Sequence, residues 1–151
     1  MPRLITENKV YSFNADRGTK TIEKRETSTG WEDTAVYSDP LFENDIVTLS
    51  TDGDYTVKKA KKNDVIIGRI TRMLKPKINE DTNECQVELY GDMYEMPLLT
   101  ANKVIANASE VKLTADGVDS GAGGLYTLEA MAANDVKEVV DVFKPSVGKM
   151  E

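Results

Sequence analysis

The side chains that most often carry out catalysis are scarce in this sequence. The chain has no histidine and a single cysteine, Cys85. Histidine is the most common general acid–base residue and the most common metal ligand, and it usually activates a nucleophilic serine or cysteine. A Ser-His-Asp triad, a Cys-His pair and a zinc site of cysteines and histidines therefore cannot be built within one chain. A lone cysteine also cannot form an internal disulfide, which agrees with a reducing compartment.

Carboxylates are the one catalytic residue type in good supply, with 26 Asp and Glu residues. A glycosidase needs only two of them, but the two must converge across a sugar-binding cleft. Glu80, Asp81 and Glu84 instead lie in polar stretches, and Trp31 is the sole tryptophan that could line such a cleft. Solvated surface positions explain the carboxylates better. The sequence predicts a protein without catalytic activity, and a carboxylate-dependent hydrolase stays as the enzymatic alternative.

Two loops have partial ligand-binding patterns. Asp52-Gly53-Asp54 is spaced like the start of a calcium loop, but the later bidentate glutamate is missing. Gly121-Ala122-Gly123-Gly124 lacks the Lys-Ser/Thr that follows a phosphate-binding loop and the glycine spacing of a dinucleotide site. Tight turns explain both loops, so we expect neither a metal nor a cofactor.

The charge distribution argues against nucleic acid as a partner. The formal net charge is −7, with +4 on residues 44–78 and −9 on residues 79–151. An acidic surface repels phosphate. One cluster of basic residues is an exception, and it comprises Lys58, Lys59, Lys61 and Lys62. This cluster has no interleaved aromatic residues that could stack on bases. A solvated strand edge, where lysines discourage aggregation, and a contact with an acidic protein surface are the two better explanations.

The apolar residues follow the pattern of short strands separated by turns. Ile46–Leu49 leads into Asp52-Gly53, a strong hairpin signal, and Tyr55–Val57 resumes the strand. All apolar runs are much shorter than the roughly 20 residues that span a bilayer. The first residues lack the apolar stretch of a secretory signal. We therefore expect no membrane contact and synthesis in the cytoplasm.

The predicted fold class is all-β, or mostly β with a short helix, in a small antiparallel barrel or sandwich. Residues 1–43 have 14 charges and little periodicity, so we expect them to form an extended N-terminal arm or appended hairpins, with a β-rich core domain over residues 44–151. Residues 128–143 have apolar residues at helical spacing, and strand and helix both stay open there. The residues predicted to face inward are Val47, Leu49, Val57, Ile66, Ile70, Val87 and Leu89.

The second half of the chain echoes the first. Residues 49–53 match residues 113–117 at an offset of 64, and residues 53–65 match residues 124–136 at an offset of 71. We interpret this as a duplicated β unit. The additional residues of the second copy would then be the glycine-rich stretch at residues 119–124.

Several apolar side chains stand in polar surroundings and are candidates for a protein contact. Trp31 lies between Gly30 and two acidic residues, and Phe42 ends the polar N-terminal region. Both are predicted to anchor that region against another subunit or the shell of a larger assembly, because a tryptophan can supply a large share of interface energy when it is buried. The second candidate group comprises Met93, Tyr94 and Met96. Burial beneath the protein's own arm is an equal alternative for this group and for Trp31.

The order of strands and turns between Asp45 and Ile70 resembles that of the capsid cement, or decoration, proteins of tailed bacteriophages. The match covers about 26 residues, with a weaker second pass over residues 113–136. The long polar N-terminal region and the insertion at residues 119–124 depart from the shorter members. The matching elements are Ile46–Leu49, Asp52-Gly53, Tyr55–Ala60, Asn63-Asp64 and Ile66–Ile70.

The resemblance implies a viral structural protein that binds the outer surface of an assembled capsid and stabilises it. The implied partners are the major capsid protein and further copies of this chain, as a homotrimer or another homo-oligomer. The implied location is the virion surface, after assembly in the host cytoplasm, and no catalytic residues are implied. Weak contacts repeated over a symmetric lattice add up to a large stabilisation. A phage tail or baseplate subunit and a small ligand-binding β-barrel are the alternatives.

Overall fold

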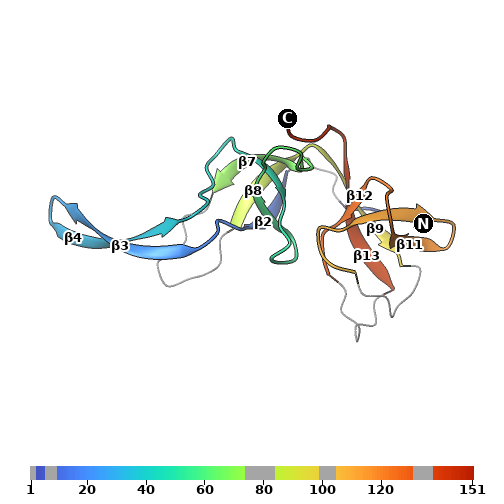
Figure 1. The fold of residues 1–151 in the computed structure, drawn as a ribbon, viewed down its shortest axis with the longest axis horizontal. Coiled ribbons are helices and arrows are strands. Elements are labelled where there is room, and N and C mark those ends of the chain that lie inside the picture. Colours follow the sequence, from blue (N-terminus) through green and yellow to red (C-terminus); the bar gives the residue numbers. More distant parts are fainter. Residues whose placement is uncertain (1–2, 6–9, 74–83, 99–104, 131–137) are drawn as a thin grey trace.

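The predicted all-β fold is confirmed by the computed structural model, which describes residues 3–5, 10–73, 84–98, 105–130 and 138–151. No described segment is a helix that could cross a membrane. The strands are arranged as a closed barrel, a six-stranded sheet and a two-stranded hairpin (Figure 1). They are β1 (Arg3–Leu4), β2 (Val10–Ala15), β3 (Lys20–Thr27), β4 (Gly30–Tyr37), β5 (Ile46–Leu49), β6 (Thr56–Lys59), β7 (Gly68–Met73), β8 (Glu84–Leu89), β9 (Gly91–Pro97), β10 (Glu110–Thr114), β11 (Gly117–Ser120), β12 (Leu125–Thr127) and β13 (Val139–Pro145).

The closed barrel has the strand order β2-β6-β5-β7-β8. Its neighbouring strands are antiparallel except at the closure, where β2 runs parallel to β6 and Asn14 lies beside Thr56. Successive residues of a strand point to opposite faces, so every second side chain points into the barrel. These inward side chains are mostly apolar and fill the interior. Those with almost no exposed surface include Phe13, Val47, Val57, Ile70 and Val87.

The six-stranded sheet, β1-β9-β13-β12-β10-β11, curls into a second barrel-like unit. A parallel bridge between Leu98 and Val118 brings the end of β9 to β11. The unit has its own buried cluster, composed of Met96, Ile105, Val111, Val118, Leu125, Val140 and Val142. In Figure 1 it lies beside the closed barrel, and the N-terminus lies against it because β1 pairs with β9.

The two units have the same strand pairing, which confirms the predicted duplication. Around the first unit the strand order is β2-β6-β5-β7-β8, and around the second it is β9-β11-β10-β12-β13. The equivalent strands are therefore β2 and β9, β5 and β10, β6 and β11, β7 and β12, and β8 and β13. Val47 lies opposite Gly68 as Val111 lies opposite Leu125. Extending these registers around both units pairs buried residues at six positions: Phe13 with Met96, Val47 with Val111, Val57 with Val118, Ile70 with Thr127, Cys85 with Val140, and Val87 with Val142.

The sequence alignment of the two copies was only half right. The offset of 64 is correct at the ends of the equivalent strands β5 and β10, where it places Leu49 on Leu113, but not at Gly53, which lies in the β5–β6 loop while Gly117 begins β11. The offset of 71 is wrong because it aligns β6 with β12, whereas the equivalent of β6 is β11. The longer β5–β6 loop, residues 50–55, makes the first copy longer at this point, so residues 119–124 are not the predicted insertion.

The predicted boundary between an arm and a core does not follow the structure. β2 pairs with β8 from Val10 to Asn14 and closes the barrel, and Phe13 is fully buried. Leu41 also belongs to the first core cluster. Only part of residues 1–43 therefore extends from the barrel, and that part is the β3–β4 hairpin, at the left of Figure 1.

Six of the seven residues predicted to face inward are buried. Ile66 is the exception, since it is half-buried while Ile67 has no exposed surface. A shift of one residue in an extended segment exchanges the two faces, which explains the error. Strand rather than helix is correct for β13, and residues 131–137 of the ambiguous segment lie outside the described residues.

The β5–β6 loop joins the two units. The backbone N–H of Tyr55 donates to the Leu128 carbonyl at 2.7 Å, and the Asn107 side chain donates to the Ser50 carbonyl at 3.2 Å. Met93, Leu128 and Phe143, although carried by the second unit, pack into the core cluster of the first. The two barrels therefore share a packed and hydrogen-bonded junction.

Candidate interaction surface

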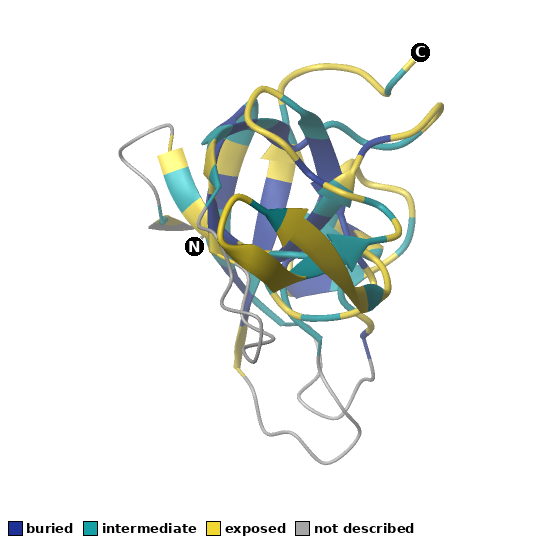
Figure 2. Ribbon diagram, turned by 90° about the vertical axis from the view of Figure 1, so that its left-hand side faces the viewer, coloured by how far each residue is buried: buried dark blue, intermediate teal, exposed yellow. Residues whose placement is uncertain are grey.

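The β3–β4 hairpin is the most exposed regular element of the described chain. Its strands pair in continuous register from Lys20 opposite Tyr37 to Thr27 opposite Gly30, around a two-residue turn. Figure 2 shows the hairpin from its end, with most of its outer half exposed. Trp31 is 69% exposed. Because an isolated two-stranded hairpin is marginally stable in water, a hairpin of this length with an exposed tryptophan favours a contact with another molecule.

The two faces of the hairpin differ in composition. Side chains alternate between faces along a strand, and the register places Trp31, Ile22 and Ala35 on the same face. Two charge pairs are matched across the strands, since Lys24 lies opposite Asp33 and Arg25 lies opposite Glu32, whereas Lys20, Glu23 and Glu26 lie opposite uncharged residues. Cross-strand pairs of opposite charge stabilise a ladder by roughly 0.2–1 kcal/mol. The Lys24–Asp33 row therefore has no net charge, and Trp31 and Ala35 lie on either side of it on the same face.

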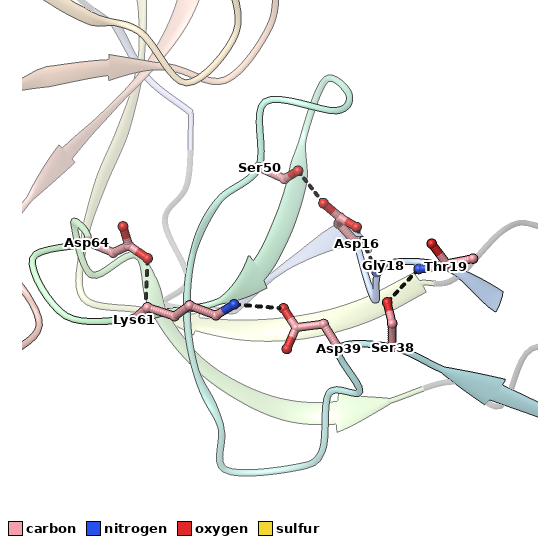
Figure 3. Close-up of polar contacts among 8 residues, drawn as sticks. All are labelled: Asp16, Gly18, Thr19, Ser38, Asp39, Ser50, Lys61 and Asp64. Carbon is pink, nitrogen blue, oxygen red and sulfur yellow. Dashed lines mark hydrogen bonds and ion pairs between the residues drawn. The ribbon is translucent and has the colours of Figure 1, made fainter.

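A set of hydrogen bonds fixes the base of the hairpin (Figure 3). The Thr19 N–H donates to Ser38 Oγ at 2.8 Å, the Gly18 N–H donates to Asp16 Oδ1 at 3.0 Å, and the Ser50 hydroxyl donates to Asp16 Oδ2 at 2.7 Å. Burial raises the pKa of Asp16, but the hydrogen bonds from Ser50 and Gly18 outweigh burial and hold the pKa below its usual value. The base is therefore tied to the β5–β6 loop of the first barrel.

Gly18 is required at this base. Its φ of +77° lies in the left-handed region, and a Cβ at this position would overlap Ser38 Oγ. Glycine alone adopts such a conformation without a steric cost. The close approach of Gly18 to Ser38 is what allows the chain to leave β2 and turn directly into β3.

A cation–π contact supports the hairpin beside these hydrogen bonds. The buried guanidinium of Arg17 lies 4.9 Å from the centroid of the Tyr37 ring. Such contacts contribute about 0.5–2 kcal/mol, with more where the cation is desolvated. The hairpin is thus held in a defined direction at its base, while its tip is exposed.

The lysine cluster lies near this base and has two roles. Lys59 and Lys62 are exposed, which agrees with a solvated edge. Lys61 forms an ion pair of 3.7 Å with Asp39, directly after the hairpin, and Lys58 is half-buried. Exposed pairs of this kind contribute little stability. The cluster is therefore partly engaged with the protein's own acidic groups.

Phe42 lies beside the hairpin and is 62% exposed. Its backbone N–H donates to Asp45 Oδ2 at 2.9 Å, in a turn that buries the neighbouring Leu41. A groove of about 700 Å³ lies between this turn and β4, lined mainly by Glu32–Tyr37 and Pro40–Phe42. The sequence therefore identified two exposed aromatic residues, Trp31 and Phe42, on the same hairpin and turn, but it did not reveal the groove between the turn and β4.

The second group of predicted contact residues is placed differently. Met93 and Met96 are buried, in the first and second core clusters respectively. Tyr94 is half-buried and pairs with Leu4 of β1. The prediction of a surface contact at the two methionines was wrong because β9 lies at the junction and contributes to both cores. The Gly91-Asp92 pair, a turn signal in the sequence, stands at the start of β9 and was the available sign that a strand follows.

The described residues contain no group of three or more His, Cys, Asp and Glu side chains that could hold a metal. Two carboxylates accept hydrogen bonds at the junction, where the backbone N–H of Asp141 donates to Glu129 Oε1 at 3.3 Å and the Tyr55 hydroxyl donates to the Asp141 side chain. Burial and then the Asp141 carboxylate raise the pKa of Tyr55 above its usual value. These groups hold the β5–β6 loop against the second unit.

The backbone amides of the glycine-rich loop are hydrogen-bonded to a carboxylate side chain of the protein itself. The N–H groups of Gly123 and Gly124 donate to Glu110 Oε2 at 3.0 and 3.1 Å. A carboxylate thus occupies the amide groups that a phosphate would need. This arrangement agrees with a turn at residues 121–124 and not with a phosphate site.

Comparison with known proteins adds no relative. The chain matches no protein-family model, no curated protein and no solved structure. The interaction surface is therefore interpreted from its own residues.

Proposed function

We propose that this protein is a viral structural protein that binds the outer surface of an assembled phage capsid and stabilises it. The observation that carries the proposal is the projecting β3–β4 hairpin, with Trp31 exposed on it and its base fixed to the barrel. Its proposed partners are the major capsid protein and further copies of this chain. The choice of a capsid rests on the resemblance between Asp45 and Ile70, the segment that forms β5, β6 and β7.

The described geometry favours binding over catalysis or ligand storage. The first barrel is filled by its own side chains, with Phe13, Val57 and Val87 almost without exposed surface, so its interior has no room for a ligand. The carboxylates of Asp141 and Glu129 are engaged in hydrogen bonds at the junction. A rigid scaffold with an exposed apolar projection fits a protein that contacts another protein.

The energetics of a lattice suit such a contact. A tryptophan that becomes buried at the centre of an interface can contribute about 2 kcal/mol or more. One hairpin gives a modest affinity, but a capsid repeats its binding sites and makes the sum of the contacts large.

The test is co-sedimentation of the purified protein with capsids that lack it. Trp31→Ala should weaken binding about 30-fold, the equivalent of about 2 kcal/mol. Leu113→Ala is the matched control, because Leu113 is an exposed apolar residue of β10 in the second unit. Equal binding of the two variants would exclude the hairpin as the contact. Binding of the wild-type protein to tails or baseplates but not to capsids would favour the tail alternative.

A further inference from the structure

The outer edge of β4 is an open strand edge that lines the groove. Residues Glu32–Tyr37 form one wall, and Pro40, Leu41 and Phe42 contribute to the other. Within the described residues, β3 is the only strand that pairs with β4. A sheet edge beside an apolar wall is the geometry that accepts an additional strand from another chain.

The register shows which backbone groups face the groove. The Ser38 N–H donates to the Thr19 carbonyl at 3.0 Å, so hydrogen-bonded rows recur at every second residue along the hairpin. The rows of Glu32, Thr34 and Val36 bond to β3. The N–H and C=O groups of Asp33, Ala35 and Tyr37 consequently point away from β3, toward the edge.

The two edges of the hairpin are not equivalent. β3 has charged residues at five of its eight positions, which are Lys20, Glu23, Lys24, Arg25 and Glu26. β4 has only Glu32 and Asp33, followed by four uncharged residues, Thr34–Tyr37. Natural sheets protect open edges with charged residues, lysine above all. By this criterion β3 is protected against strand addition and β4 is open to it.

We propose that the groove takes one extended strand of the capsid protein, which pairs with β4 and packs an uncharged side chain against Leu41 and Phe42. This inference rests on the proposed function and names the partner segment of the same surface. The occupant is uncharged because the groove's Arg25, Glu32 and Asp33 already have oppositely charged cross-strand neighbours. A volume of about 700 Å³ is of the size that holds a drug-sized molecule, hence a short single strand and not the whole hairpin of a second copy.

The test uses proline, which removes a backbone N–H but is tolerated where that N–H points away from the ladder. Ala35 and Ile22 lie opposite each other in the same row, so Ala35→Pro removes an outward donor from β4 and Ile22→Pro removes the matching donor from β3. Ala35→Pro should weaken binding to capsids that lack the protein roughly tenfold or more. Ile22→Pro should bind like Ile22→Ala, which removes the same exposed side chain from the Trp31 face but keeps the N–H.

Hydrogen–deuterium exchange provides a second readout that needs no variant. Binding to capsids should protect the amides of Asp33, Ala35 and Tyr37 and leave those of Ile22 and Lys24 unprotected. Unchanged exchange in β4 on bound capsids, or equal binding of both proline variants, would overturn strand addition while the proposed function stands. If the wild-type protein does not bind capsids, the proposed function itself fails. A dimer of the free protein that Ala35→Pro dissociates and Ile22→Pro does not would place a second copy in the groove instead.

Discussion

The two barrels have the same strand pairing but differ in what is inserted between equivalent strands. Between β2 and β5 the first barrel has residues 16–45, which include the hairpin, whereas residues 98–109 connect β9 and β10 in the second. The β5–β6 loop, residues 50–55, is also longer than its counterpart, Ala115-Asp116. The loops that connect strands vary in length more readily than the strands themselves. The proposed interaction surface and the junction between the units therefore each lie in an insertion of the first barrel.

The equivalent cores also use different chemistry at one position. Ile70 of β7 fills the first barrel with methyl groups, and its counterpart in the second is Thr127. The Thr127 hydroxyl donates to the Ala106 carbonyl at 2.7 Å and accepts from the Ser109 N–H at 3.0 Å. A buried hydroxyl is tolerated when its hydrogen bonds are made. The second barrel therefore fixes its β9–β10 connection through a core side chain.

The largest expected effect separates the hairpin from the barrel that carries it. Deleting residues 1–43 removes β2 and opens the first barrel, so we expect the loss of cooperative unfolding in urea. Replacing residues 21–36 with a short glycine-containing turn, which keeps Thr19, Tyr37 and Ser38 at the base, should keep the urea midpoint close to that of the full chain, because the outer part of the hairpin buries little apolar surface. Circular dichroism and urea titration would measure both. A folded 44–151 fragment would restore the predicted domain boundary and contradict the role of β2.

The next effect tests the polar core position of the second barrel. Thr127→Val keeps the side-chain shape but leaves the Ala106 carbonyl and the Ser109 N–H without this partner, so it should cost about 1–3 kcal/mol. Ile70→Val at the equivalent position is the control and should cost about 0.5–1.5 kcal/mol. Urea midpoints of the two variants would be compared. A smaller loss for Thr127→Val than for Ile70→Val would show that the hydroxyl does not hold the connection.

Sequence patterns predicted the parts of this fold that depend on local alternation. Val47, Leu49 and Val57 were placed correctly because a two-residue period flanks an Asp-Gly turn. The role of Phe13 was missed because β2 closes the barrel through the parallel and distant strand β6, a pairing that no local pattern encodes. Met93 was misread for a similar reason, since its burial depends on contact between the two units.

The candidate site was predictable to the same extent. Trp31 and Phe42 could be found because large aromatic residues in polar surroundings are unusual, and both are exposed. The groove could not be found, because its walls meet only after Arg17 packs on Tyr37 and the Phe42–Asp45 turn forms. The sequence thus revealed the two unusual aromatic residues, but it did not reveal the groove, which is formed by residues that are distant in the sequence.

The smallest expected effect concerns Cys85, whose equivalent in the second barrel is Val140. Both are buried in the same position of the repeated unit, so Cys85→Val should change the free energy of unfolding at pH 7 by no more than about 1.5 kcal/mol. Cys85→Ser is the matched control. It should destabilise the protein by about 1–3 kcal/mol because it buries a hydroxyl among apolar side chains.

The thiol also makes a pH-dependent contribution that the valine variant should lack. Burial raises the pKa of Cys85 from 9.0 to about 11, with Glu84 adding to the increase and Arg17 opposing it. A raised pKa means that the folded state favours the neutral thiol, so this stabilisation is complete below pH 9.0 and is lost as the pH rises toward about 11. Urea titrations at pH 8 and pH 10 should show a smaller alkaline loss for Cys85→Val than for the wild-type protein. The remaining loss would include Tyr55, whose pKa is also raised, and an identical loss in both proteins would mean that Cys85 is not buried as its match with Val140 requires.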